Sequence, residues 1–238
     1  MILYRWVNTL KKALGKLQGV LDRKEKIIYL DLSVHTLKQK FVKLHEVGHN
    51  VLTWQQKTYD AFEDDENTLD VAVQEEFEKG AIFFASATLF QQDRFVSEMD
   101  KYGLEIETAI QLSKHFGASI YATLRRYVEY SKKQCALIVL KDRTSSGAKL
   151  RDRFQSQNFT KTFGELSIPT EIERVYPFIQ DYCSNLKLKK DGLVSLPTKN
   201  GSVDFTYHFF DNTYNAFVFL FPMGEKKSTR TKFIISAK

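Results

Sequence analysis

The stretch Leu44-His45-Glu46-Val47-Gly48-His49 holds two histidines four positions apart, with a glutamate directly after the first. In a helix, which rises about 1.5 Å per residue, such side chains share one face, about 6 Å apart along the axis. Two neutral imidazoles at that spacing can reach one tetrahedral Zn²⁺. Glu46 would lie beside the metal, where a carboxylate can take a proton from water and pass it to a leaving amine. The stretch therefore predicts a helix with two metal ligands and a general base, and it requires a third ligand.

The third ligand is expected from a predicted helix over residues 71–91, which contains Glu75, Glu76 and Glu78. Four apolar residues follow Glu78 at helical spacing: Ala81, Ile82, Ala85 and Leu89. This pattern predicts that Glu78 lies on a buried stripe, where a carboxylate needs a partner such as a metal. Glu75 falls on the same side and is the runner-up, whereas Glu76 points away. The alanines and Gly48 would let the two helices approach closely.

Two segments together resemble a known family, residues 43–49 and residues 77–86. They are similar to the ImmA/IrrE metallopeptidases of bacteria and their mobile elements, which show H-E-x-G-H followed by E-x-x-A-N-x-F-A. The resemblance covers about residues 26–130, and Ile82 stands where the family usually has Asn. It implies that His45, His49 and Glu78 are the zinc ligands and that Glu46 is the catalytic glutamate. The segment before the motif is short for the family, so either the true start lies upstream or a first helix is missing.

The surrounding segments predict a small sheet and several helices. Residues 5–18 indicate a basic amphipathic helix, and residues 26–32, rich in β-branched and aromatic side chains, a strand. Zinc peptidases use a strand in this position to hold the substrate backbone by strand addition. Residues 53–70 are acidic and predict a solvated loop, with a lid over the cleft as the alternative.

Residues 104–130 predict two helices separated by Gly117, a pattern that resembles a helix-turn-helix. Arg125 and Arg126 would lie on the second helix, where they could contact DNA. The same unit also occurs in the ImmA/IrrE fold as a packing element, and we favour that interpretation. The sequence thus predicts a mostly helical, zincin-like metallopeptidase domain over residues 1–132, with a small N-terminal sheet and this helix-turn-helix-like segment.

Residues 133–238 predict a second, small α+β domain, which makes the whole chain α+β. Strands are expected at residues 135–140, 203–209, 217–221 and 232–236, and a helix, broken or kinked at Pro177, at residues 170–186. Residues 141–162 are polar and give no clear prediction. Some relatives carry a GAF-like sensor domain in this position, and this half could be one.

Composition limits the remaining choices. The net charge is +6 and the isoelectric point about 9.1, which permits an acidic partner such as DNA without requiring one. Cys135 and Cys183 match no metal or redox spacing and are expected to be reduced, which fits the cytoplasm. No apolar run reaches the length of a membrane span.

The sequence therefore predicts a cytoplasmic metallo-endopeptidase with Zn²⁺, or Mn²⁺ as an alternative, at His45, His49 and Glu78. By the resemblance, its substrate would be a regulatory protein, typically a helix-turn-helix transcriptional repressor, cut once to start a stress-response or mobile-element programme. The alternative is a non-catalytic DNA-binding or sensor regulator. The sequence identifies neither the cleavage site, the signal, the C-terminal ligand, the oligomeric state nor the group that stabilises the transition state.

Overall fold

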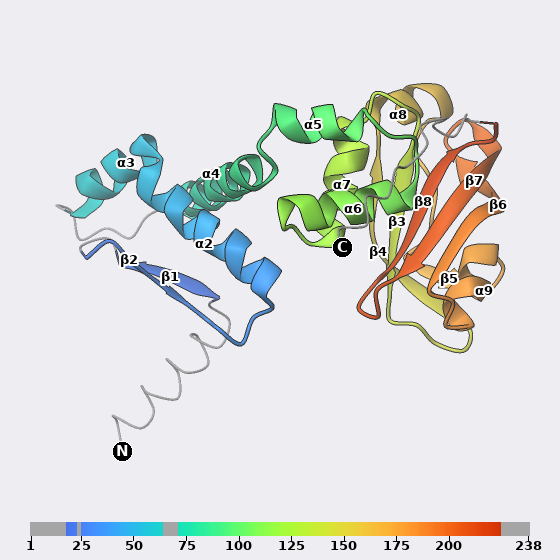
Figure 1. Cartoon of the computed structure of the whole chain (residues 1–238), viewed down its shortest axis with the longest axis horizontal. Helices are drawn as coiled ribbons and strands as arrows, with labels where there is room; N and C mark the ends of the chain where they lie inside the picture. The colour runs from blue at the N-terminus through green and yellow to red at the C-terminus, as the bar shows by residue number, and fades with distance from the viewer. Residues whose placement is uncertain (1–17, 23–24, 64–70, 225–238) are drawn as a thin grey trace, which may run out of the picture. The chain divides into compact units, whose positions relative to one another are not determined.

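A computed structural model describes residues 18–22, 25–63 and 71–224 of the chain, which is coloured by residue number in Figure 1. The chain forms two compact units, one of residues 1–94 and 116–119 and the other of residues 95–115 and 120–238. The division into residues 1–132 and 133–238 expected from the sequence stays a prediction. The predicted helix over residues 5–18 and the predicted strand at residues 232–236 lie, apart from Gln18, outside the described residues.

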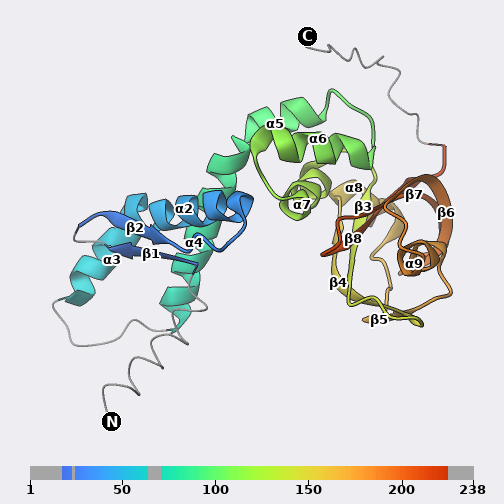
Figure 2. The ribbon, with the colours of Figure 1, turned by 60° about the horizontal axis from the view of Figure 1, so that its bottom comes forward.

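The described residues of the first unit form a hairpin and three helices, apart from the start of helix α5 (Asp93–Met99). Strands β1 (Gly19–Asp22) and β2 (Ile27–Leu30) pair antiparallel, and helices α2 (Thr36–Val51), α3 (Thr53–Glu63) and α4 (Val71–Phe90) follow. The hairpin lies beside α2 in both Figure 1 and Figure 2. The predicted strand at residues 26–32 and the predicted helices at the motif and at residues 71–91 are confirmed.

Helices α2 and α4 pack closely because small residues meet between them. A Cβ atom placed on Gly48 would lie 3.2 Å from the Cα of Ala81 and 3.1 Å from a ring carbon of Phe84. Ala81 and Ala85 are fully buried on α4. The expected close approach of the two helices is therefore present, and it brings Glu78 to the face of α2 that carries the histidines.

The expectation of a loop at residues 53–70 is wrong for its first part, which forms α3. The segment contains good helix formers, including Gln55, Gln56 and Lys57, and Gln55 is fully buried. Its acidic residues therefore did not decide its structure. Residues 64–70, where a lid was the alternative, lie outside the described residues.

The second unit contains a six-stranded antiparallel sheet with the order β5-β4-β3-β8-β7-β6. Its strands are β3 (Ala136–Lys141), β4 (Gly147–Gln155), β5 (Glu171–Glu173), β6 (Leu188–Thr198), β7 (Gly201–Asp211) and β8 (Ala216–Pro222). Its helices are α5 (Asp93–Met99), α6 (Ile106–Phe116), α7 (Ile120–Tyr130), α8 (Gln157–Phe163) and α9 (Pro177–Cys183). The first two residues of α5 and the last residue of α6 belong to the other unit.

Helices cover both faces of this sheet, as Figures 1 and 2 show. On one face, Ile138, Phe205 and Tyr207 pack with Phe159 of α8 and Phe178 of α9. Since neighbouring residues of a strand point to opposite faces, the intervening residues form the other face. There the ring of Phe219 meets that of Tyr127 in α7 at 5.6 Å between centroids. The long apolar runs of β3 and β8 follow from burial on both sides.

The prediction for residues 170–186, a helix kinked or divided at Pro177, is wrong for its first part. That part contains the short strand β5, and Pro177 begins helix α9. Proline is favoured at a first helical position because its missing N–H has no partner there in any case. The segment without a clear prediction, residues 141–162, contains β4 and the start of α8, and β6 was not predicted.

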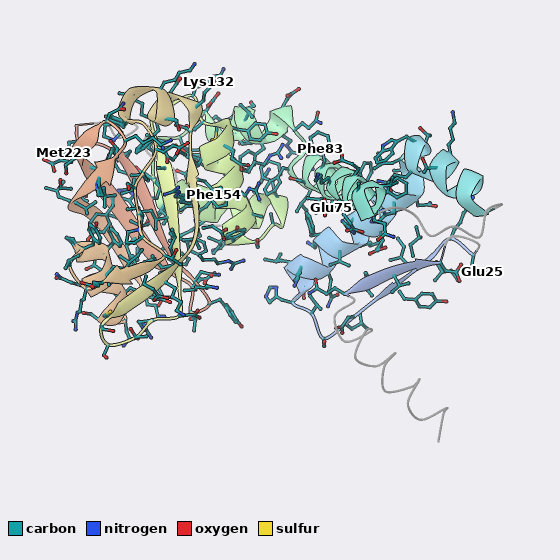
Figure 3. The ribbon with its side chains drawn as sticks, turned by 180° about the vertical axis from the view of Figure 1, so that it is seen from behind. Glu25, Glu75, Phe83, Lys132, Phe154 and Met223 are labelled. Atoms are coloured by element: carbon teal, nitrogen blue, oxygen red, sulfur yellow. The ribbon has the colours of Figure 1, made fainter. Side chains whose placement is uncertain are left out.

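The predicted pair of helices at residues 104–130 is present as α6 and α7, and Gly117 between them has φ +63°. The two arginines considered for DNA contact lie against protein groups. Arg126 is 6% exposed, and Arg125 donates to Glu129 at 2.8 Å with its guanidinium 5.0 Å from the ring centre of Phe154, labelled in Figure 3. These contacts favour the packing interpretation. Across the described ranges, no helix has both the length and the apolar character that a membrane crossing requires.

Candidate metal centre

Helix α2 places His45 and His49 on one face, one turn apart. Their rings meet edge to face with centroids 4.7 Å apart, and the two Nε2 atoms are 3.1 Å apart. The helix begins after His35, whose Nδ1 accepts a hydrogen bond from the backbone N–H of Leu37 at 3.3 Å. The motif therefore lies within a capped helix, and both imidazoles present the same nitrogen to the same point.

Glu78 of α4 brings a carboxylate to that point. Its Oε2 lies 3.2 Å from Nε2 of His45, and its Oε1 lies 3.4 Å from Nε2 of His49. Within the residues that the structure describes, this is the one cluster of three potential metal-binding side chains, with ligand atoms all within 4.8 Å of one another. The runner-up, Glu75, is exposed and is not part of this cluster (it is labelled in Figure 3). Glu76, expected to point away, pairs with Lys79 at 2.7 Å.

The donor atoms fit a tetrahedral metal ion. Zinc binds imidazole nitrogen and carboxylate oxygen at about 2.0–2.2 Å, and a tetrahedron of that size has edges of about 3.3–3.6 Å. The two Nε2 atoms, 3.1 Å apart, are close to such an edge. Each Nε2 faces a different oxygen of Glu78, at 3.2 and 3.4 Å, and with one ligand atom per residue the three atoms lie within 4.8 Å of one another. Three ligands leave one corner of a tetrahedron open, as in catalytic rather than structural zinc sites.

One part of the reasoning that selected Glu78 is wrong. The Glu78 side chain is 59% exposed rather than buried, and Ile82, four residues later, is 49% exposed. The buried stripe of α4 runs instead through Phe77, Ala81 and Ala85. Glu78 thus lies at the edge of this stripe. The two histidine side chains are 16% and 10% exposed, so the centre is enclosed on the α2 side and open on the Glu78 side.

Glu46 lies next to the centre on the side of α2 that faces β1. It is half-buried, and its Oε1 and Cγ each lie 3.1 Å from the position that a Cβ atom on Gly19 would take. The same atom would lie 2.5 Å from Val42, so only glycine fits at this position of β1. The backbone of β1 therefore passes directly beside the Glu46 carboxylate.

Burial lowers the pKa of His45, and the neighbouring His49 lowers it further, while Glu78 and Glu46 act in the opposite direction. The net effect favours the neutral imidazole. A neutral imidazole has a lone pair on one nitrogen, which is the form that binds a metal.

Sequence reasoning missed Gln55, which contacts both helices of the centre. Its Oε1 lies 2.8 Å from Nδ1 of His49, and its Nε2 donates to the backbone carbonyl of Phe77 at 2.8 Å. Gln55 is fully buried, and Trp54 beside it packs edge to face on Phe77 with centroids 5.0 Å apart. The signal was a polar residue soon after the motif helix, but it lay within a segment predicted to be a solvated loop.

Comparisons with known proteins place these observations in a family. No curated protein matches the chain. A solved structure described as a Mycobacterium tuberculosis transcriptional regulator is similar over 86% of this chain, with 10% identity and a TM-score of 0.48. The match spans 62% of that protein's length, and a likeness this weak supports no inference about fold or function.

The family described as the IrrE N-terminal-like domain, Peptidase M78, matches residues 6–127. The match includes α2 and α4 and therefore every residue of the candidate centre. It agrees with the resemblance to ImmA/IrrE proteins seen in the two sequence motifs. The chain belongs to the IrrE N-terminal-like (Peptidase M78) family of metallopeptidases.

Proposed function

We propose that the protein is a zinc metallo-endopeptidase whose metal is held by His45, His49 and Glu78. The observation that carries the proposal is the convergence of three donor atoms, two imidazole nitrogens and a carboxylate, within 4.8 Å of one another. Membership of a metallopeptidase family supports the same chemistry. The ligand set suits zinc, with manganese as the alternative because imidazole and carboxylate ligands also suit Mn²⁺.

The metal and residues of the chain have different roles in the proposed reaction. A bound divalent metal would supply a Lewis acid that polarises a peptide carbonyl and makes water more acidic. Glu46, directly after the first ligand, accepts a proton from the attacking water and delivers it to the leaving amine. Gly19 leaves the space in which the Glu46 side chain lies, and the backbone of β1 limits how far that side chain can turn away.

The open side of the centre suits a protein substrate. A segment of substrate could add to the edge of the β1–β2 hairpin, which lies beside α2, and thereby bring a peptide bond to the exposed side of Glu78. By the family resemblance, the substrate is a helix-turn-helix transcriptional repressor in the cytoplasm, cut at one site. Such a cut would switch on a stress-response or mobile-element programme.

A second candidate is a non-catalytic regulator that binds DNA or senses a ligand through the second unit, which could be GAF-like. The feature that favours it is a separate compact unit with its own sheet and core, which a peptidase centre does not require. Arg125 and Arg126 contact other groups of the protein, which argues against DNA recognition by α7. Under this candidate, binding to duplex DNA should weaken steeply with salt and depend on the two arginines.

Cleavage of purified repressors, followed by intact-mass spectrometry, tests the peptidase proposal. Repressors encoded beside this protein are the first substrates to test, with the zinc-loaded parent and two variants. Glu46→Gln should reduce cleavage by about 10²–10⁴-fold at unchanged metal content, because the amide cannot take the proton. The matched control Glu75→Gln changes an exposed glutamate of α4 and should cut like the parent. Cleavage by Glu46→Gln at the parent rate would refute the assigned role.

A further inference from the structure

A single buried amide connects the two helices of the candidate centre. Gln55 lies in the first turn of α3, and its backbone N–H donates to the carbonyl of Leu52 at 2.9 Å. The chain turns back after α2 here, since Leu52 itself donates to the carbonyl of Gly48 at 3.0 Å. Because of this turn, the side chain of Gln55 lies against the ring of His49. It contacts Nδ1 of that ring, whereas Nε2 faces Glu78.

The partners of Gln55 fix the direction of its amide. A backbone carbonyl can only accept a hydrogen bond, so the group that faces the oxygen of Phe77 must be the NH₂ of Gln55. Its oxygen then faces Nδ1 of His49 at 2.8 Å, and an amide oxygen can only accept. Nδ1 of His49 must therefore carry the proton. In a neutral imidazole, this leaves the lone pair on Nε2, the atom directed at His45 and Glu78.

The space for this side chain depends on a glycine of α4. A Cβ atom on Gly80 would lie 3.0 Å from Nε2 of Gln55 and 2.8 Å from the ring of Trp54. Gly80 stands two residues after Glu78, and the carbonyl that accepts from Gln55 belongs to Phe77, the residue before Glu78. The amide thus reaches the backbone of α4 at the turn from which the Glu78 carboxylate extends.

We propose that Gln55 is a positioning residue of the metal centre, which holds His49 in the Nδ1–H tautomer and ties it to the turn of α4 that carries Glu78. This inference rests on the proposed function, because it assigns a role toward the metal of that centre. Hydrogen-bonding partners of metal ligands orient the ligand and raise its basicity, and their loss weakens metal affinity by about 10–100-fold. Gln55 connects one candidate ligand, His49 of α2, to the backbone of α4 at the residue before the other, Glu78.

Zinc affinity and the tautomer of His49 test the inference on the full chain. Competition with a chromophoric chelator measures affinity at one fixed pH, and long-range ¹H–¹⁵N spectra of the imidazoles report the tautomer without any activity assay. Gln55→Met keeps the length of the side chain and removes both hydrogen bonds. It should bind zinc about 10–100-fold more weakly, and its His49 should populate both tautomers. The matched control Lys57→Met changes an exposed residue of the same helix and should behave like the parent.

Gln55→Glu distinguishes the effect of the hydrogen bond to His49 from that of general packing. A carboxylate still accepts from Nδ1 of His49 but cannot donate to the carbonyl of Phe77. This variant should therefore keep the Nδ1–H tautomer and recover only part of the affinity lost in Gln55→Met. Zinc affinity and tautomer in Gln55→Met equal to those of the parent would overturn the inference. If Gln55→Met does not fold, an Nε2–H tautomer of His49 in the metal-free parent would overturn it as well. A parent that binds no zinc would instead refute the proposed function.

Discussion

The two units differ in what fills their interiors. Among the residues that the structure describes, eleven of the twelve largest fully buried side chains belong to the second unit, where aromatic rings pack on both faces of the sheet. The exception is Phe77 of the first unit, which lies directly before Glu78. Around it are polar contacts: the amide of Gln55, the imidazole of His49 and the exposed carboxylate of Glu78.

This difference indicates two sources of stability. Burial of apolar side chains should stabilise the second unit whether or not a metal is present. The first unit has a smaller described apolar interior, and its two long helices meet at the candidate metal centre. A ligand that binds only the folded form of that centre should therefore stabilise the first unit selectively.

The largest expected effect concerns the apolar interior of the second unit. Phe205 is fully buried and stacks on Phe159 with centroids 5.2 Å apart. Phe205→Ala should lower the free energy of unfolding of this unit by about 3–5 kcal/mol, from lost burial and the cavity left behind. Denaturant unfolding measures the loss, and Tyr214→Ala, at a position 84% exposed, is the control. A fall in zinc per chain along with the stability would show that the two units are not independent.

Zinc binding should stabilise the first unit. At a free concentration about 100 times its dissociation constant, a metal adds about 2.7 kcal/mol to the stability of the form that binds it. Hydrogen exchange should therefore slow for the amides of α2 and α4 and stay unchanged for those of β3 and β8. Addition of a chelator should reverse the effect. Equal slowing of hydrogen exchange in both units would contradict the expectation that zinc stabilises only the first unit.

A smaller effect is expected where α2 and α4 touch. A Cβ atom on Gly48 would be 3.2 Å from the backbone of Ala81, which cannot move without shifting α4. Gly48→Ala gains up to about 1 kcal/mol in helix propensity but loses about 1–3 kcal/mol by overpacking, so a net loss of about 1 kcal/mol is expected. Thermal unfolding followed by helical circular dichroism checks this, with exposed Lys43→Ala as control. A more stable Gly48→Ala variant would show that the helices have room to separate.

The smallest effect concerns Tyr121 in the second unit. Burial and its hydrogen bond to Asp152 raise the pKa of Tyr121 to about 12, above the ordinary value near 10. Its contribution to stability is thus complete below about pH 10 and is lost between about pH 10 and 12. Tyr121→Phe should cost about 1 kcal/mol at neutral pH and should remove one tyrosine that ionises near pH 12 from an ultraviolet titration. A titration curve unchanged by the substitution would contradict this.

The sequence predicted the ligands of the centre better than its surroundings. The structure brings His45, His49 and Glu78 together, as the spacing on the two helices predicted, although the expected burial of Glu78 was wrong. The position of Gln55 depends on how the chain turns after α2, and no local pattern encodes that turn. Acidic residues led to the prediction of a loop where α3 forms, and the helix expected on both sides of Pro177 begins only at that residue. In β6 the polar residues Lys189, Lys190 and Asp191 obscured an edge strand whose alternation begins only afterwards.

The measurement that tests the central claim most directly is the amount of metal bound per chain, by elemental mass spectrometry. It compares the purified parent with Glu78→Ala and, as matched control, Glu75→Ala. The account predicts about one zinc in the parent and in Glu75→Ala and much less in Glu78→Ala, because two imidazoles alone bind the metal weakly. A parent that stays empty after zinc or manganese is supplied, or a Glu78→Ala variant with full occupancy, would contradict it.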